Sequence, residues 1–153
     1  MGTRSFIGVM HGDVCKVVYC HWDGYLEYNG KILFENYDSP KANHLVSLGN
    51  LSILGPNIGE KHEFECSYAY GTPEYTAWRE KKSTMCTFYG RDRGEADTEF
   101  KTYTSFSALV DAFEGSWCEY CYIMKDGVWY MFNSGNTSLR PLADELAKLD
   151  AVA

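Results

Sequence analysis

The amino-acid sequence predicts an α+β fold: one mostly antiparallel sheet of about five to seven strands, with three or four short helices packed on one side. Short runs rich in β-branched and aromatic residues alternate with glycine-containing turns, which is typical of antiparallel hairpins. Between these runs lie segments that begin with a capping residue and repeat apolar residues at helical spacing. Residues 1–153 match the size of a single domain, which can fold without a metal or a disulfide.

The first predicted elements are a β-hairpin and the segment that leaves it. Residues 3–9 and 14–20 are β-prone and flank a turn at 10–13, which predicts two antiparallel strands. The second strand ends in Cys-His-Trp-Asp-Gly-Tyr, the 20–25 segment. Side chains at a strand end are held rigidly at the base and exposed at the tip, so this segment is a candidate for function.

Two short helices and a long excursion follow. Residues 29–37 have the spacing of a short helix, and Ser39-Pro40 is typical of the start of a second one that ends at Gly49. The segment 60–85 has no regular apolar spacing and is rich in Tyr, Glu, Lys and Gly. We predict that it is a long loop or an insertion within the domain, and loops of this length are uncommon unless they are functional or mobile.

The second half of the chain predicts more strands and two helices. One helix begins at the capping residue Ser105, and a terminal helix spans 141–149. Asp126-Gly127 between two β-rich runs is a strong hairpin signal. The predicted strands in this half are 86–89, 100–104, 116–124, 128–133 and 138–140.

Composition and charge exclude several classes of function. A net charge of −7 argues against general nucleic-acid binding and against an anionic membrane surface as partner, because both require a basic field. The sequence shows neither a signal peptide nor an apolar run of the roughly 20 residues that span a membrane. We therefore expect a cytoplasmic protein whose six cysteines form no structural disulfide. The aromatic content of 16% suits binding surfaces.

Three interpretations of the 20–25 segment stay open. In a small enzyme, Asp23 would orient His21 as a general base and Cys20 would be the nucleophile. In a structural strand end, the polar side chains would hydrogen-bond the turn that follows. In a binding rim, the contacts would come from His21, Trp22, Asp23 and Tyr25. Catalysis is the least favoured of the three.

The glycine-bounded loop 90–95 is the second candidate, since Arg91 and Arg93 closely follow Tyr89. Arginine binds phosphate groups in a bidentate manner and aromatic rings stack on bases, so this loop is able to hold a nucleotide. In the alternative, both arginines pair with neighbouring carboxylates in a solvated loop. Glu119, within a later aromatic run, is a further candidate for the lining of a pocket.

A structural zinc module is another alternative. Cys118 and Cys121 have the C-x-x-C spacing, and Cys20, His21 and His11 would have to complete the site. Zinc sites of this kind usually contain two such pairs, or a Cys pair with a His pair. An odd spacing within a strand would also point the two thiols to opposite faces. We therefore predict no metal and no cofactor.

Several motifs resemble a family of small hypothetical proteins from tailed bacteriophages and prophages. They lie at residues 1–5, 18–25, 29–33, 54–56, 58–62, 86–95 and 117–120. The resemblance covers most of the chain, is weakest over 64–84, and transfers no catalytic residue.

The resemblance implies an accessory phage protein that acts in the cytoplasm of the infected bacterial host. Such proteins counter anti-phage defence as inhibitors that bind a host defence protein, or they sequester a small nucleotide signal. We expect binding of one of these two kinds rather than catalysis. The exposed aromatic strands also allow a homodimer.

Overall fold

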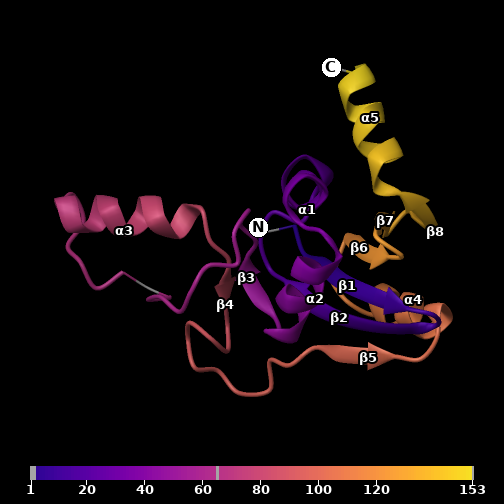
Figure 1. Cartoon of the computed structure of the whole chain (residues 1–153), viewed down its shortest axis with the longest axis horizontal. Coiled ribbons are helices and arrows are strands. Elements are labelled where there is room, and N and C mark those ends of the chain that lie inside the picture. The colour runs from indigo at the N-terminus through magenta and orange to yellow at the C-terminus, as the bar shows by residue number, and fades with distance from the viewer. Residues whose placement is uncertain (1–2, 65, 153) are drawn as a thin grey trace.

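The computed structural model describes residues 3–64 and 66–152, and it contains one mixed, mostly antiparallel sheet with helices on both faces (Figure 1). The α+β class is therefore confirmed. The strands are β1 (Ser5–His11), β2 (Val14–Cys20), β3 (Leu51–Ile53), β4 (Thr87–Phe88), β5 (Lys101–Tyr103), β6 (Tyr120–Lys125), β7 (Val128–Asn133) and β8 (Asn136–Pro141). The helical elements are a π-helical turn η1 (Leu26–Gly30), then α1 (Lys31–Asn36), α2 (Ser39–Ser47), α3 (Pro73–Ser83), α4 (Phe106–Glu114) and α5 (Leu142–Val152).

The strands follow the order β4-β3-β2-β1-β6-β7-β8, and β5 pairs with β2. β1 runs parallel to β6 and β2 runs parallel to β3, while the other pairs are antiparallel. The two predicted hairpins, β1–β2 and β6–β7, are both present, and the long parallel register between β1 and β6 joins them. They form the rigid centre on which the other elements are built.

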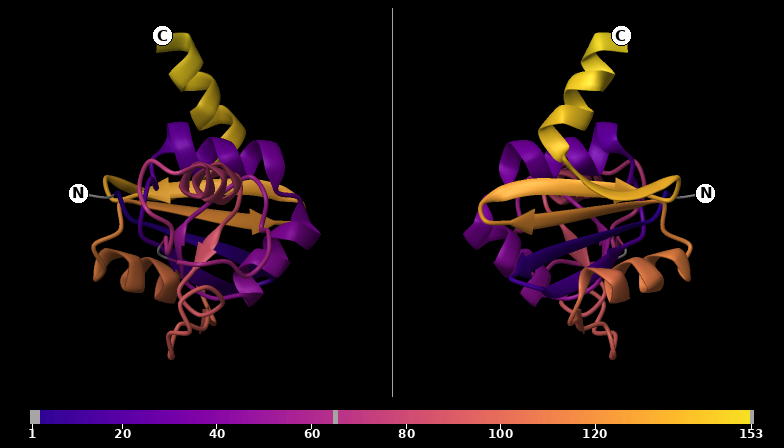
Figure 2. Two further views of the ribbon diagram at one scale, coloured as in Figure 1. Left: turned by 90° about the vertical axis from the view of Figure 1, so that its left-hand side faces the viewer. Right: turned by 90° about the vertical axis from the view of Figure 1, so that its right-hand side faces the viewer.

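Both faces of the sheet are apolar, and each is covered. α1, α2 and α5 cover one face, where Leu33, Leu45 and Leu142 pack against sheet residues such as Tyr122. We expected the helices on one side, and these three follow that expectation. α4 instead packs on the opposite face, where Phe113 joins a second apolar cluster (Figure 2). The reason is the sheet itself, since consecutive buried residues of a strand point to opposite faces and both need a cover.

Two helix starts show how well local signals work. Ser105 Oγ accepts a hydrogen bond from the backbone N–H of Ala108 at 3.1 Å, so the predicted cap of α4 is confirmed. The cap of α2 lies one residue earlier than predicted, because Asp38 Oδ1 accepts from the backbone N–H of Lys41 at 3.0 Å and Ser39 is already helical. Aspartate and serine cap equally well, so two adjacent candidates are not separated by residue type.

The segment 60–85 contains a helix that the sequence pattern did not predict. α3 extends away from the sheet and buries none of its residues (Figure 1). Its start is nonetheless well formed, with Pro73 in the first turn and Thr72 Oγ1 accepting from the backbone N–H of Tyr75 at 3.2 Å. A helix without a core face has no apolar periodicity, which is the signal that a sequence search uses.

Within residues 3–64 and 66–152, no helix has the length and apolar character that crossing a membrane would require.

Candidate functional site

The outer edge of β2 is interrupted by a notch. β1 pairs with the whole of β2 along its inner edge. Along the outer edge, β5 pairs with residues Cys15–Val17 and β3 pairs with Cys20, so the stretch between them has no partner strand on this side. The backbone N–H of Tyr19 in this stretch donates instead to Asn50 Oδ1 at 2.9 Å. A side chain thus replaces a strand at this point, and the sheet edge is left open beside it.

A hollow of about 570 Å³, the notch pocket, lies at this opening. Its volume falls within the roughly 300–1,000 Å³ typical of ligand sites. The described residues that line it are Tyr19, Asn50, Tyr89, Arg93, Glu95, Asp97 and Thr98. Two phenol rings, one guanidinium and two carboxylates therefore face the same space.

Asn50 holds the walls of the notch pocket together. Its side-chain oxygen accepts from Tyr19, its backbone N–H donates to Thr98 O at 2.7 Å, and its carbonyl accepts from the backbone N–H of Tyr89 at 3.2 Å. One residue thus joins β2, the end of β4 and the loop that precedes β5. Sequence reasoning missed Asn50 because nothing in its local sequence indicates contacts with three distant segments.

Tyr19 and His21 form a hydrogen-bonded pair beside this pocket. Tyr19 Oη lies 2.6 Å from His21 Nδ1. Burial raises the pKa of Tyr19 to about 12, and burial together with the nearby Arg4 lowers the pKa of His21. Both groups are therefore neutral near pH 7, so this hydrogen bond joins two uncharged side chains. The His21 ring also contacts Trp22 edge-on, with centroids 4.7 Å apart, so the three side chains hold one another in place.

The side chains of Cys20 and His21 point to opposite faces of the sheet. The Cys20 thiol is fully buried in the cluster under α1, α2 and α5, where it accepts a hydrogen bond from Asn29 Nδ2 and donates to Trp22 O. Desolvation raises its pKa to about 12. Since the thiolate is the nucleophilic form, this thiol is inert at neutral pH. The geometry thus argues against an enzyme that uses Cys20, His21 and Asp23.

Asp23 and Tyr25 shape the turn after β2 and do not line the notch pocket. Asp23 has a φ of 58°, and its carbonyl accepts from the backbone N–H of Asn29. The Tyr25 carbonyl accepts from the backbone N–H groups of Tyr28 and Gly30 in the π-helical turn, and its ring packs on Tyr28. Gly24 between them has no room for a side chain, because a Cβ atom there would lie 2.7 Å from the Cβ of Ser5.

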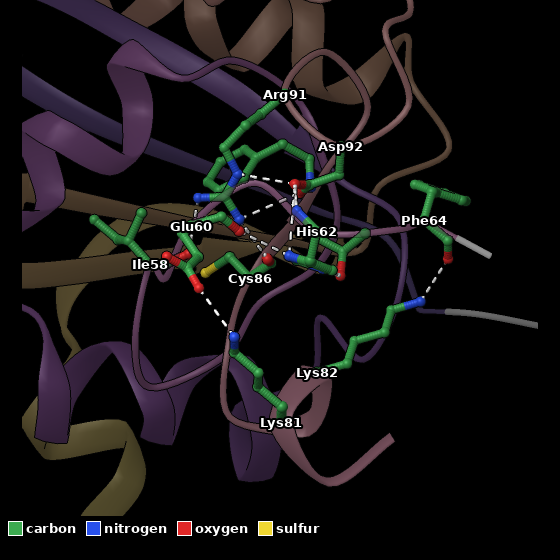
Figure 3. Close-up of polar contacts among 11 residues, drawn as sticks. Ile58, Glu60, His62, Phe64, Lys81, Lys82, Cys86, Arg91 and Asp92 are labelled. Carbon is green, nitrogen blue, oxygen red and sulfur yellow. Dashed lines mark hydrogen bonds and ion pairs between the residues drawn. The ribbon is translucent and has the colours of Figure 1, made fainter. Parts of the chain in front are cut away.

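Arg91 is committed to holding its own loop (Figure 3). Its guanidinium donates to the buried Asp92 carboxylate and to the carbonyls of Ile58 and Cys86 at 3.0 and 2.9 Å, and it lies over the Phe88 ring. Asp92 accepts in addition from the backbone N–H groups of Phe88 and His62. We therefore assign Arg91 a structural role and no longer propose it as a ligand-binding residue.

Arg93, two residues further on, is exposed at the rim of the notch pocket. Its guanidinium lies over the Phe64 ring at 5.1 Å, and its Nε atom is 3.9 Å from the Glu95 carboxylate. Phe64 in turn contacts Tyr89, with centroids 5.8 Å apart. Arg93 and these rings continue the row that begins at Trp22. We call this row the polar-aromatic surface, and it comprises Tyr19, His21, Trp22, Phe64, Tyr89 and Arg93.

Glu119 lies elsewhere. It is exposed just before β6, on the other side of β1 from β2, and its backbone N–H donates to Arg4 O. The structure does not bring it to the notch pocket. Three pocket residues that it does bring there, Glu95, Asp97 and Thr98, were not predicted from the sequence as lining residues.

The cysteine pair is arranged differently from our expectation. Cys118 precedes β6 rather than lying within it, and it packs in the same cluster as Cys121, under α4. The expectation of opposite faces was therefore wrong, since it assumed that the strand begins earlier. In the described part of the chain, no three His, Cys, Asp or Glu side chains gather as a metal site. The zinc alternative gains no support from the structure.

No protein-family model, curated protein or solved structure matches this chain.

Proposed function

We propose that this chain acts by binding rather than by catalysis, and that it docks on a host protein through the polar-aromatic surface. In this proposal it is an accessory phage protein that works as an inhibitor in the cytoplasm of the infected host and antagonises an anti-phage defence. The resemblance of the sequence motifs to phage proteins supports the phage role, and the polar-aromatic surface supports docking on a protein. The observation that carries the proposal is the notch pocket. The exposed Arg93 lines it, and its Tyr19 is hydrogen-bonded to His21, on which the exposed Trp22 packs.

The composition of this surface supports protein recognition. Tryptophan, tyrosine and arginine dominate the energetic centres of protein–protein interfaces. Trp22 is 40% exposed although its ring packs on His21, so it presents a large apolar area at little cost in side-chain entropy. Tyr19 is likewise held by its hydrogen bond to His21. A surface already ordered in this way loses less freedom when a partner binds.

The charges of the notch pocket favour a basic side chain over a phosphate chain. Glu95 and Asp97 outnumber Arg93 among the described lining residues, and Arg91 is committed to Asp92. A lysine or arginine of the partner would place its charge between the two carboxylates and its alkyl stem along the tyrosine rings. The net charge of −7 would speed the approach of a basic partner.

Sequestration of a nucleotide is the second candidate, because two phenol rings and Arg93 face one pocket. A base would stack on Tyr19 or Tyr89, and Arg93 would hold a phosphate group. With one guanidinium against two carboxylates, the pocket suits a ligand with few phosphates.

The test is capture from a bacterial lysate with immobilised wild-type protein and two matched pairs of variants. We expect Trp22→Ala and Arg93→Glu to lose a host protein that the wild type retains. Trp117→Ala and Arg79→Glu change an exposed tryptophan and an exposed arginine that do not line the notch pocket, and they should retain that protein.

Calorimetry against a panel of cyclic and ADP-ribose-type nucleotides separates the two candidates. The docking proposal predicts no measurable heat for any of them. If a nucleotide bound the wild type and Arg79→Ala but not Arg93→Ala, we would conclude that the protein sequesters a nucleotide and does not dock on a host protein. If Trp22→Ala and Arg93→Glu both captured the host protein as well as the wild type does, the polar-aromatic surface would not be its docking surface.

A further inference from the structure

A second surface lies between α1 and α5, away from the notch pocket. Two hollows, of about 570 and about 220 Å³, meet at Phe34 and Glu35, which line both of them. The larger hollow opens toward the β6–β7 turn and the smaller one toward the side of α5. We call the pair the α1–α5 groove. In Figure 1, α5 stands at one end of the molecule and the loop before β5 at the other, so the groove and the notch pocket are separate.

The floor of the groove is apolar and open to solvent. Phe34 is 48% exposed and Val128 is 47% exposed, and both rank among the most exposed large apolar side chains of the described chain. Leu146 and Leu149 of α5 are half-buried in the smaller hollow, and Trp129 forms part of the larger one. Apolar side chains gathered in this way on a surface indicate a binding site rather than a solvated face.

The rim of the groove is acidic. Four carboxylates and one lysine are among its described lining residues, and they are Glu27, Glu35, Asp38, Asp150 and Lys31. Two further lysines on the neighbouring helices are engaged elsewhere. Lys41 donates to the carbonyls of Asn36 and Pro56, and Lys148 is paired with Glu145. The negative charge of the rim would repel an anionic lipid surface or a nucleic acid, so the groove suits neither.

We propose that the α1–α5 groove binds a basic amphipathic segment of a partner protein. Apolar side chains of that segment enter the hollows on either side of Phe34, and its lysines or arginines face the acidic rim. A helix is the form that suits this arrangement, since one apolar face with basic flanks fits a groove between two helices.

A second copy of this chain fits the groove poorly. Two grooves that face each other across a twofold axis would bring two acidic rims together, in a protein that already carries a net charge of −7. The charge pattern therefore selects a basic partner and disfavours a homodimer through this face.

The test uses a fluorescent synthetic peptide of about 14 residues, with leucine and lysine placed to form one apolar and one basic helix face. The control peptide has glutamate in place of lysine. Fluorescence anisotropy should show that the lysine peptide binds the wild type and that its affinity falls as salt rises. The glutamate peptide should not bind.

Variants locate the binding site. Glu35→Lys should weaken the lysine peptide by about tenfold or more, because it removes one rim charge and adds an opposite one at the junction of the hollows. Glu114→Lys makes the same change in charge at an exposed position of α4, away from the groove, and should weaken binding of the lysine peptide far less. Phe34→Asp should abolish binding, with circular dichroism as the check on folding, since Phe34 is exposed and not part of the core.

Three results would overturn the proposal. The first is no binding of the lysine peptide at millimolar concentration. The second is equal binding by Glu35→Lys and Glu114→Lys, which would indicate a general attraction to an acidic protein. The third is a dimer in sedimentation that Phe34→Asp converts to a monomer, which would assign the groove to a second copy. Because Trp22→Ala and Arg93→Glu should leave peptide binding unchanged, this outcome is independent of the proposed function.

Discussion

At the scale of single residues, Arg91 and Arg93 stand two positions apart and have opposite surroundings. Arg91 is mostly buried and donates to the Asp92 carboxylate and to two carbonyls, whereas Arg93 is half-exposed with one loose ion pair. Both lie in a loop whose sequence alone suggested two equivalent phosphate ligands. The difference arises because the Ile58 and Cys86 carbonyls come from segments that the fold, not the loop, brings close.

Arg91→Ala should therefore lower the free energy of unfolding by about 3–5 kcal/mol, because it leaves the buried Asp92 carboxylate without its cation. Arg93→Ala is the matched control, and it should cost no more than about 0.5 kcal/mol. Urea denaturation followed by circular dichroism measures both values. The double variant Arg91→Ala/Asp92→Asn should recover part of the loss, and equal costs for the two single variants would contradict the structural role of Arg91.

Cysteine reactivity is the second residue-scale prediction. Five of the six thiols are buried, and Cys66 in the segment before α3 is the more accessible one. With a colorimetric disulfide reagent at about pH 8, the native protein should show one fast-reacting thiol, which Cys66→Ser removes and Cys20→Ser does not. Burial raises the pKa of Cys20, so a fast phase lost in Cys20→Ser would restore the nucleophile interpretation.

At the scale of elements, α3 and α4 make a useful contrast. They are of similar length, but α3 has no buried residue whereas Leu109 and Phe113 of α4 are fully buried. Packing of an apolar face supplies most of the stability of a helix in a protein. α3 instead depends on its Thr72 cap and on contacts at its ends, such as the Lys81–Glu60 ion pair.

A proline in the middle of each helix tests this contrast, since proline in a helix interior costs about 3 kcal/mol or more. Ala77→Pro should disrupt α3 locally and leave global thermal unfolding nearly unchanged. Val110→Pro should remove α4 from the sheet and unfold the domain. Differential scanning calorimetry measures both, and a large loss of thermal stability in Ala77→Pro would mean that α3 is part of the cooperative core.

Local signals predicted elements well where the interactions that form them are themselves local. The Asp126-Gly127 hairpin and the Ser105 cap depend on residues within a few positions, so the sequence was enough to place them. The spacing of apolar residues did not predict α3, which has no core face. It also predicted too early a start for β6, which begins two residues after Cys118.

At the scale of the whole molecule, one ionic contact ties the end of the sheet to the last helix. Arg140 at the end of β8 donates to the Glu145 carboxylate at 2.9 Å and to the carbonyls of Asn136 and Ser138. Hydrogen bonds from Lys148 and Arg140 lower the pKa of Glu145 in the folded protein. One arginine thus joins the irregular edge strand to α5.

This contact gives stability a dependence on pH. Because the folded pKa of Glu145 is lowered, its contribution is present above the ordinary glutamate pKa and is lost as the pH falls through the folded value. Wild type should exceed Glu145→Gln in urea midpoint at about pH 7, and the two should converge toward about pH 3. Glu80→Gln, at an exposed position of α3, should match the wild type at both pH values. A difference in urea midpoint between wild type and Glu145→Gln that stays constant with pH would show that the ion pairs of Glu145 do not cause the pH dependence.

By itself the sequence determined the α+β class, the two central hairpins and most helix positions, and it indicated the segments that are candidates for function. These follow from turns, caps and apolar spacing, which act over a few residues. Only the tertiary structure decided which side chains of those segments are free to contact a ligand or a partner. It buried Cys20 and left His21 half-buried beside Tyr19, committed Arg91 to Asp92 and left Arg93 at a pocket, and gave Asn50 its position between three segments. Burial and hydrogen bonding depend on contacts between residues far apart in the chain, and no local pattern contains that information.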